Sequence, residues 1–153
     1  MAGDTLRDAF RTRLATHRTT AAIPWPIRDV INTAEQPHPP AADAASAAAG
    51  HLEIDFPGAS EAQYTFGAPG ANLHREQGQV TIRAVTRLRA GTTVRDLAET
   101  YTAALRSLFR MDRFAAGSLT VRITSTAPMG GGIDEAGMWV ESLALGYEIY
   151  NVG

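Results

Sequence analysis

Residues 79–109 carry the clearest hydrophobic pattern in the chain. From Val80 to Leu88 the apolar side chains fall mainly on one parity and the arginines on the other, the period-two pattern of a strand with one buried face. After Ala90-Gly91 the period changes to 3.6, and the apolar side chains fall on one helical stripe. This stretch therefore predicts a strand, a tight turn and an amphipathic helix over residues 93 to 109.

The N-terminal third predicts a second helix and a long loop. Leu6, Phe10 and Leu14 recur every four residues and predict a helix over residues 5 to 18. Ile23-Pro24-Trp25-Pro26 predicts an extended piece that is not a central strand, because its two prolines interrupt strand pairing. The Pro- and Ala-rich stretch Ile31–Gly50 lacks an amphipathic pattern and predicts a loop.

The remaining patterns predict strands separated by proline and glycine. Pro57-Gly58 is expected to end one strand, Met111–Gly117 to form a link, and Pro128 with Gly130–Gly132 to form a loop. The predicted strands are His51–Phe56, a weaker one at Glu61–Phe66, a long one starting between Leu73 and Gln79, Leu119–Ile123 and Met138–Tyr150.

This order of elements predicts one α+β domain over residues 1–153. We expect a mainly antiparallel or mixed β-sheet packed against the amphipathic helix, with an N-terminal helix and long loops.

The amino-acid composition excludes several classes of functional site. The chain has no cysteine and no lysine, which excludes disulfides, thiolate metal sites, thiol nucleophiles and Schiff-base chemistry. The net charge of −2 gives no overall basic field toward nucleic acid or anionic membranes. There is no apolar run of about 18 residues and no signal-peptide pattern at the N-terminus, so we expect a protein made and assembled in a cytoplasm.

The candidate catalytic and metal-binding groups are isolated. His51, Glu53 and Asp55 share one face of a predicted strand and could bind a metal, but a solvated polar face is the favoured interpretation. The patch His74-Arg75-Glu76 has no acid–base partner in the sequence. The glycine triplet at Gly130 is followed by neither Gly-Lys-Ser/Thr nor a helix, so it does not predict a phosphate site. The sequence therefore predicts no catalytic residue, no metal and no cofactor.

Arginines on the long strand are candidates for contacts between subunits. Arg83, Arg87 and Arg89 share one strand face and could follow a phosphate backbone. The slightly acidic chain favours pairs with carboxylates instead, in the same subunit or the next one. The interface candidates are these three arginines together with Glu53, Asp55, His74, Arg75 and Glu76.

The order of segments resembles that of the tail terminator, or tail-completion, proteins of long-tailed bacteriophages and phage-like gene transfer agents. The likeness covers nearly the whole chain. It depends most on Ile23–Pro26, on Gly67–Gly70 and on the strand, turn and helix from Gly78 to Phe109, and it ends with a strand that contains Trp139.

The resemblance implies a structural virion protein rather than an enzyme. Such proteins form a ring, here expected to be a hexamer, which caps the tail tube, stops its polymerisation and joins it to the head-side connector or stopper. Its partners would be other copies of the chain, the tube protein and the connector, with double-stranded DNA passing through the lumen without sequence-specific binding. The alternatives are another connector, stopper or tube ring protein and, from a different class, a small α+β ligand-binding or hydrolytic domain.

Overall fold

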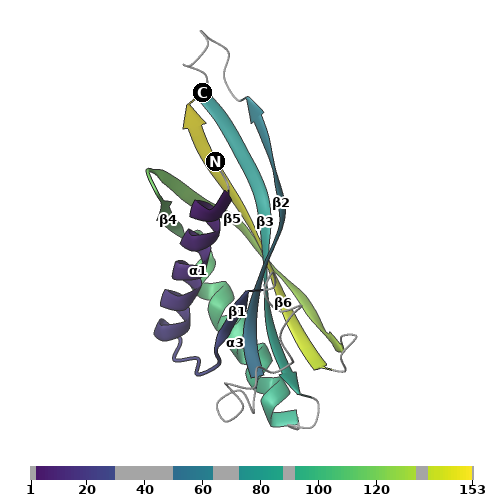
Figure 1. Ribbon diagram of the computed structural model, residues 1–153. Helices are drawn as coiled ribbons and strands as arrows, with labels where there is room; N and C mark the ends of the chain where they lie inside the picture. Colours follow the sequence, from purple (N-terminus) through teal and green to yellow (C-terminus); the bar gives the residue numbers. More distant parts are fainter. Residues whose placement is uncertain (1–2, 30–49, 64–72, 88–91, 134–137, 153) are drawn as a thin grey trace.

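The described part of the chain folds into two helices and one long, twisted sheet (Figure 1). The computed structural model describes residues 3–29, 50–63, 73–87, 92–133 and 138–152. The elements are α1 (Gly3–Thr20), β1 (Ile27–Asp29), β2 (Gly50–Gln63), β3 (Leu73–Arg87), α3 (Thr92–Phe109), β4 (Arg113–Ala116), β5 (Leu119–Ile133) and β6 (Met138–Val152). The predicted α+β class, with a sheet packed against an amphipathic helix, is confirmed.

The sheet has the strand order β1-β2-β3-β6-β5-β4. β1 pairs with β2 in parallel, and every other neighbouring pair is antiparallel. The registers align Ile54, Ile82 and Leu143 across the three central strands. The described helices α1 and α3 lie on the same face of the sheet (Figure 1), which we call the helix face. The opposite face is called the far face.

The core lies between the helices and the helix face. Phe10 of α1 is fully buried, and its ring meets the rings of Phe56, Phe114 and Tyr147 at centroid distances of 5.1 to 6.1 Å. The predicted inward side chains of β6 are also buried. They follow the expected alternation Leu143, Leu145, Tyr147 and Ile149, while Trp139 is half-buried. Burial of these rings and aliphatic side chains is the main stabilising contribution, at roughly 2–3 kcal/mol for each.

The extended piece Ile23–Pro26 carries Trp25 into this core. The indole is buried and packs edge-to-face on Tyr101 of α3 at 5.0 Å. The strand that follows, β1, lies at the end of the sheet, in agreement with the prediction that the proline-flanked segment does not form a central strand.

Two predicted strand ends were wrong. β2 continues through Pro57-Gly58 to Gln63, because a register shift between Asp55 and Gly58 absorbs the proline in a bulge. The separate strand predicted at Glu61–Phe66 is therefore, as far as Gln63, the second half of β2. β5 likewise continues through Pro128 and the glycine triplet to Ile133, with shifts after Ile123 and after Pro128.

The predicted link at Met111–Gly117 contains a strand instead. β4 pairs with β5 across a tight turn in which Gly117 has φ +62°, a value that suits glycine. Its inward side chains, Phe114 and Ala116, complete the core under α1. Four residues are too short a run for alternation to predict a strand.

Several predictions fall outside the described residues. These are the loop at residues 31–49, the turns Gly67–Gly70 and Ala90-Gly91, and the side chain of Arg89. Within the described part of the chain, no helix is both long and apolar enough to cross a membrane.

Candidate functional site: charged groups of the sheet

The predicted polar ladder on β2 is mostly buried. His51 is fully buried, Glu53 is nearly so, and the His51 Nε2–H donates to the Glu53 carboxylate at 3.0 Å. The favoured interpretation, a solvated polar face, is therefore wrong for these two residues. The strand that carries them is buried on both faces at this point, since Leu52 and Ile54 are also buried. No cluster of three metal-ligating side chains was found among the residues that the structure describes.

Arg83 pairs with a carboxylate of its own subunit. It lies directly opposite Glu53 in the β2–β3 register, and its Nη2 donates to Asp55 Oδ2 at 3.2 Å. Both partners are about one-third exposed, so water screens the pair and its contribution to stability is small. The structure thus brings Glu53, Asp55 and Arg83 together on the far face of one subunit.

The patch His74-Arg75-Glu76 does not form one surface. Glu76 lies opposite Ile149 and is buried on the helix face, whereas Arg75, the next residue in the strand, points to the far face. Burial of the Tyr147 ring, together with the negative charge of Glu76, raises the pKa of Tyr147 to about 12. Glu76 is therefore part of the buried interior, and His74, on the same parity, is half-buried.

The other predicted arginines are only partly placed. Arg87 is the last residue of β3 and lies opposite Met138 of β6, but its side chain is outside the described set. Arg89 is outside it altogether.

The most strongly connected charged group was missed by the sequence. The Asp112 carboxylate accepts hydrogen bonds from Arg13 Nε at 2.8 Å, Arg13 Nη2 at 2.6 Å, His17 Nε2 at 2.8 Å and the Arg113 backbone N–H at 2.9 Å. The cluster ties α1 to the turn between α3 and β4. The partners are 95 and 99 residues apart, and no local pattern marks such a pair.

Electrostatics agree with a structural role for this cluster. Burial by itself would raise the pKa of the Asp112 carboxyl, but the hydrogen bonds and positive charges of Arg13 and His17 outweigh it and hold that pKa below its ordinary value. The hydrogen bond to Asp112 in turn raises the pKa of Arg13. The carboxylate therefore stays ionised and saturated with donors, which leaves it poorly suited to act as a base.

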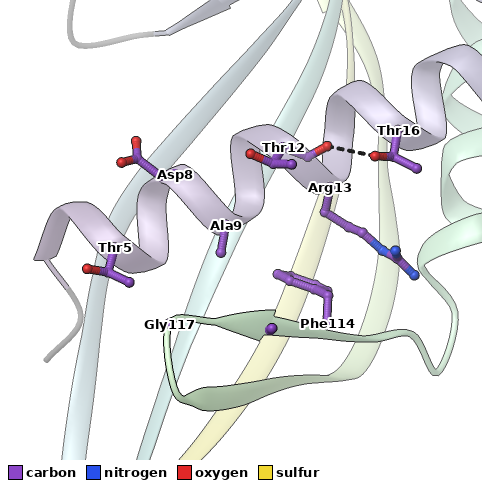
Figure 2. Close-up of a pocket in the computed structure, with 9 residues that line it drawn as sticks. Thr5, Asp8, Ala9, Thr12, Arg13, Thr16, Phe114 and Gly117 are labelled. Carbon is purple, nitrogen blue, oxygen red and sulfur yellow. Dashed lines mark hydrogen bonds between the residues drawn. The ribbon is translucent and has the colours of Figure 1, made fainter.

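Beside this cluster lies an open groove between α1 and the β4–β5 hairpin. Figure 2 shows Thr5, Ala9 and Arg13 on the side of α1 that faces Phe114 and Gly117 of the hairpin. Arg13 reaches over the Phe114 ring at 5.8 Å, in the favourable range for a cation–π contact. The groove has a volume of about 460 Å³, and among the described residues that line it the charged ones are Asp8 and Arg13. Arg13 is already bonded to Asp112 and Asp8 to Arg11, so no reactive arrangement is present in it.

A second hollow lies on the far face near the glycine triplet of β5. It encloses about 440 Å³ and is lined by Glu53, Arg83, Ser142, Val140 and residues 129–133. The hydroxyl of Ser142 has no imidazole beside it among these lining residues, and the arginine is engaged by Asp55. The hollow offers shape and two opposite charges rather than a catalytic constellation.

Comparison with known proteins supports the fold and gives no activity. No protein-family model matches the chain, and no curated protein matches it. Twelve chains of solved structures do match, so the architecture recurs elsewhere. One of them, which carries no functional description, matches 97% of this chain and 96% of its own length, with a TM-score of 0.63 and 25% sequence identity.

Proposed function

We propose that the chain is a tail terminator of a phage or phage-like particle. It would form a ring, expected to be hexameric, that caps the tail tube, stops its growth and joins the tail to the head-side connector. The protein would act as a structural subunit, without a cofactor, at the neck of a particle assembled in a bacterial cytoplasm.

The observation that carries the proposal is the order of segments along the chain. The proline-flanked Trp25 segment, the long strand and the amphipathic helix after it resemble those of tail terminators. The fold contains the elements whose order carries this resemblance, with α1 and α3 on one side of a mainly antiparallel sheet.

The chemistry of the described residues is compatible with a structural role. His51 bonds Glu53, His17 and Arg13 bond Asp112, and Arg83 bonds Asp55, so these charged groups serve contacts within the fold. A ring subunit needs shape and complementary surfaces more than it needs reactive groups.

The direct test is the assembly state of the purified full-length chain. We expect closed rings by negative-stain electron microscopy, with one dominant mass by native mass spectrometry. A monomer at micromolar concentration in several buffers would contradict the ring and favour a ligand-binding or hydrolytic domain.

A second experiment separates a terminator from other neck and tube proteins. Particles made without the chain should carry overlong tails, because the growing end of the tube is not capped. Tails of normal length that fail to join heads would indicate a stopper instead. Absence of any tube would indicate a tube subunit.

A further inference from the structure

Among the described residues, the sheet has two long stretches of strand edge without a partner strand. In this part of the chain β1 pairs only with Leu52–Ile54 of β2, and β4 pairs only with Leu119–Arg122 of β5. Within the part of the chain that the structure describes, Gly58–Gln63 of β2 and Ser125–Ile133 of β5 therefore have a partner strand on one side only. Such edges present a row of backbone donors and acceptors to another chain.

The two open edges lie at opposite ends of the molecule. Gly58–Gln63 lies beside the N-terminal half of β3, opposite residues 74–79. Ser125–Ile133 aligns, through β6, with residues 79–86 in the C-terminal half of β3. Figure 1 shows the same arrangement, with the end of β2 near the C-terminus and the end of β5 at the other extremity of the sheet.

The directions of the two edges are complementary. Each step from β2 through β3 and β6 to β5 reverses direction, so β5 runs antiparallel to β2 within one subunit. A second copy in the same orientation would therefore present its β5 edge antiparallel to the first copy's β2 edge, without being turned over. This is the head-to-tail relation that a ring requires.

The offset between the edges also suits closure. It corresponds to about five to six residues along β3, or roughly 17–20 Å at the rise of a strand. Crossing the four long strands of a subunit moves about 19 Å sideways. Together these steps give a strand tilt of about 45° to the axis of the assembly, close to the 35–45° typical of closed β-barrels. The offset is therefore compatible with a closed ring.

Two large apolar side chains are exposed at the β5 edge. Met129 and Ile133 are each 63% exposed. A Cβ added at Gly132 would meet nothing within 4 Å, so there is room for a neighbouring chain. Pro128 supplies no backbone donor, and pairing would be carried by the residues before and after it. An exposed apolar strip beside an open edge favours a protein partner over water.

From these observations we propose that subunits join by adding the β2 edge Gly58–Gln63 of one copy to the β5 edge Ser125–Ile133 of the next. The inference rests on the proposed ring function and specifies its contact. The sequence predicted a subunit contact made by charged side chains. The contact proposed here is made mainly by backbone hydrogen bonds and by Met129 and Ile133.

Engineered disulfides test this contact, since the chain has no cysteine of its own. Ser60→Cys would be combined, in one full-length chain, with Ala127→Cys, Met129→Cys or Gly132→Cys, three positions that sample the register. After oxidation at least one pair should give a ladder of covalent multimers that ends at the ring size and collapses on reduction. Each single variant should stop at dimers.

The control pair joins Ser60→Cys to Ser107→Cys on the exposed side of α3, and it should give no ladder. Native mass spectrometry of the same samples separates the two hypotheses. Rings that form without a ladder from any of the three test pairs would overturn the edge contact and leave the ring standing. Monomers throughout would overturn both. A ladder from the control pair equal to that of the test pairs would also overturn the edge contact.

Discussion

Asp112 is the residue at which α1, the end of α3 and β5 meet. Its carboxylate holds Arg13 and His17 of α1, while its backbone carbonyl accepts from the Ile123 N–H of β5 at 3.0 Å. No pattern in the sequence could predict this residue, because its partners are distant along the chain and a single aspartate after a helix looks like an ordinary turn residue.

We expect Asp112→Asn to lower the free energy of unfolding by about 2–3 kcal/mol, less than the 3–5 of a fully buried pair because Arg13 still reaches water. Since folding holds the pKa of Asp112 below its ordinary value of 3.8, this stabilisation is present above pH 4 and is lost as the pH falls through the folded value. Urea unfolding from pH 7 to pH 3 should therefore show the two proteins converging in acid. Asp8→Asn, which breaks the exposed pair with Arg11 at 2.8 Å, is the control and should change stability by less than about 0.5 kcal/mol.

Gly78 also depends on a residue that is distant in the sequence, here because of close packing and not because of charge. It lies opposite Tyr147, and a Cβ there would come within 2.8 Å of three atoms of that ring. Gly78→Ala should therefore cost about 1–3 kcal/mol by overpacking. In the separate subunit, Gly132→Ala, where a Cβ meets nothing within 4 Å, should cost well under 1 kcal/mol. Equal melting temperatures for the two variants would show that the aromatic ring of Tyr147 moves aside without loss of stability.

At the scale of elements, hydrophobic periodicity predicted the long helices and the long strand, in which the pattern repeats many times. The structure contains the helices predicted at residues 5–18 and 93–109 and the strand predicted at Met138–Tyr150, with ends shifted by two residues or fewer. Proline and glycine misled the prediction at Pro57-Gly58 and at Pro128, because long neighbouring strands keep the pairing and let a bulge absorb one residue. Such support comes from the partner strand and is not visible in the local sequence.

The helical stripe of α3 gives the test of element packing. Leu105 is buried against the sheet, so Leu105→Ala should cost about 2–5 kcal/mol of unfolding free energy. Ser107→Ala, on the exposed side of the same helix, should instead be neutral or stabilising by a few tenths of a kcal/mol. A melting temperature of Leu105→Ala within two degrees of that of the wild type would show that the apolar stripe of α3 contributes little to packing against the sheet.

At the scale of the whole molecule, the charged candidates and the open edges have separate roles. The sequence predicted carboxylates on one face of one strand and arginines on one face of another, and left open whether they pair within a subunit or between subunits. In the structure Arg83 and Asp55 already form an ion pair within the subunit. The unpaired edges depend on which strands end early, which periodicity does not reveal.

Charge exchange distinguishes pairing within a subunit from pairing between subunits. Arg83→Glu adds a third carboxylate beside Glu53 and Asp55 and should cost about 1–2 kcal/mol of subunit stability, a small figure because the pair is partly exposed. Adding Asp55→Arg to the same chain should restore most of that loss, as measured by urea unfolding. Mixing the Arg83→Glu chain with a separate Asp55→Arg chain should restore nothing, because each chain still lacks its internal partner. Recovery of stability and of ring mass only in the mixture would show instead that the pair bridges neighbouring subunits, and the charged face would then be part of the ring contact.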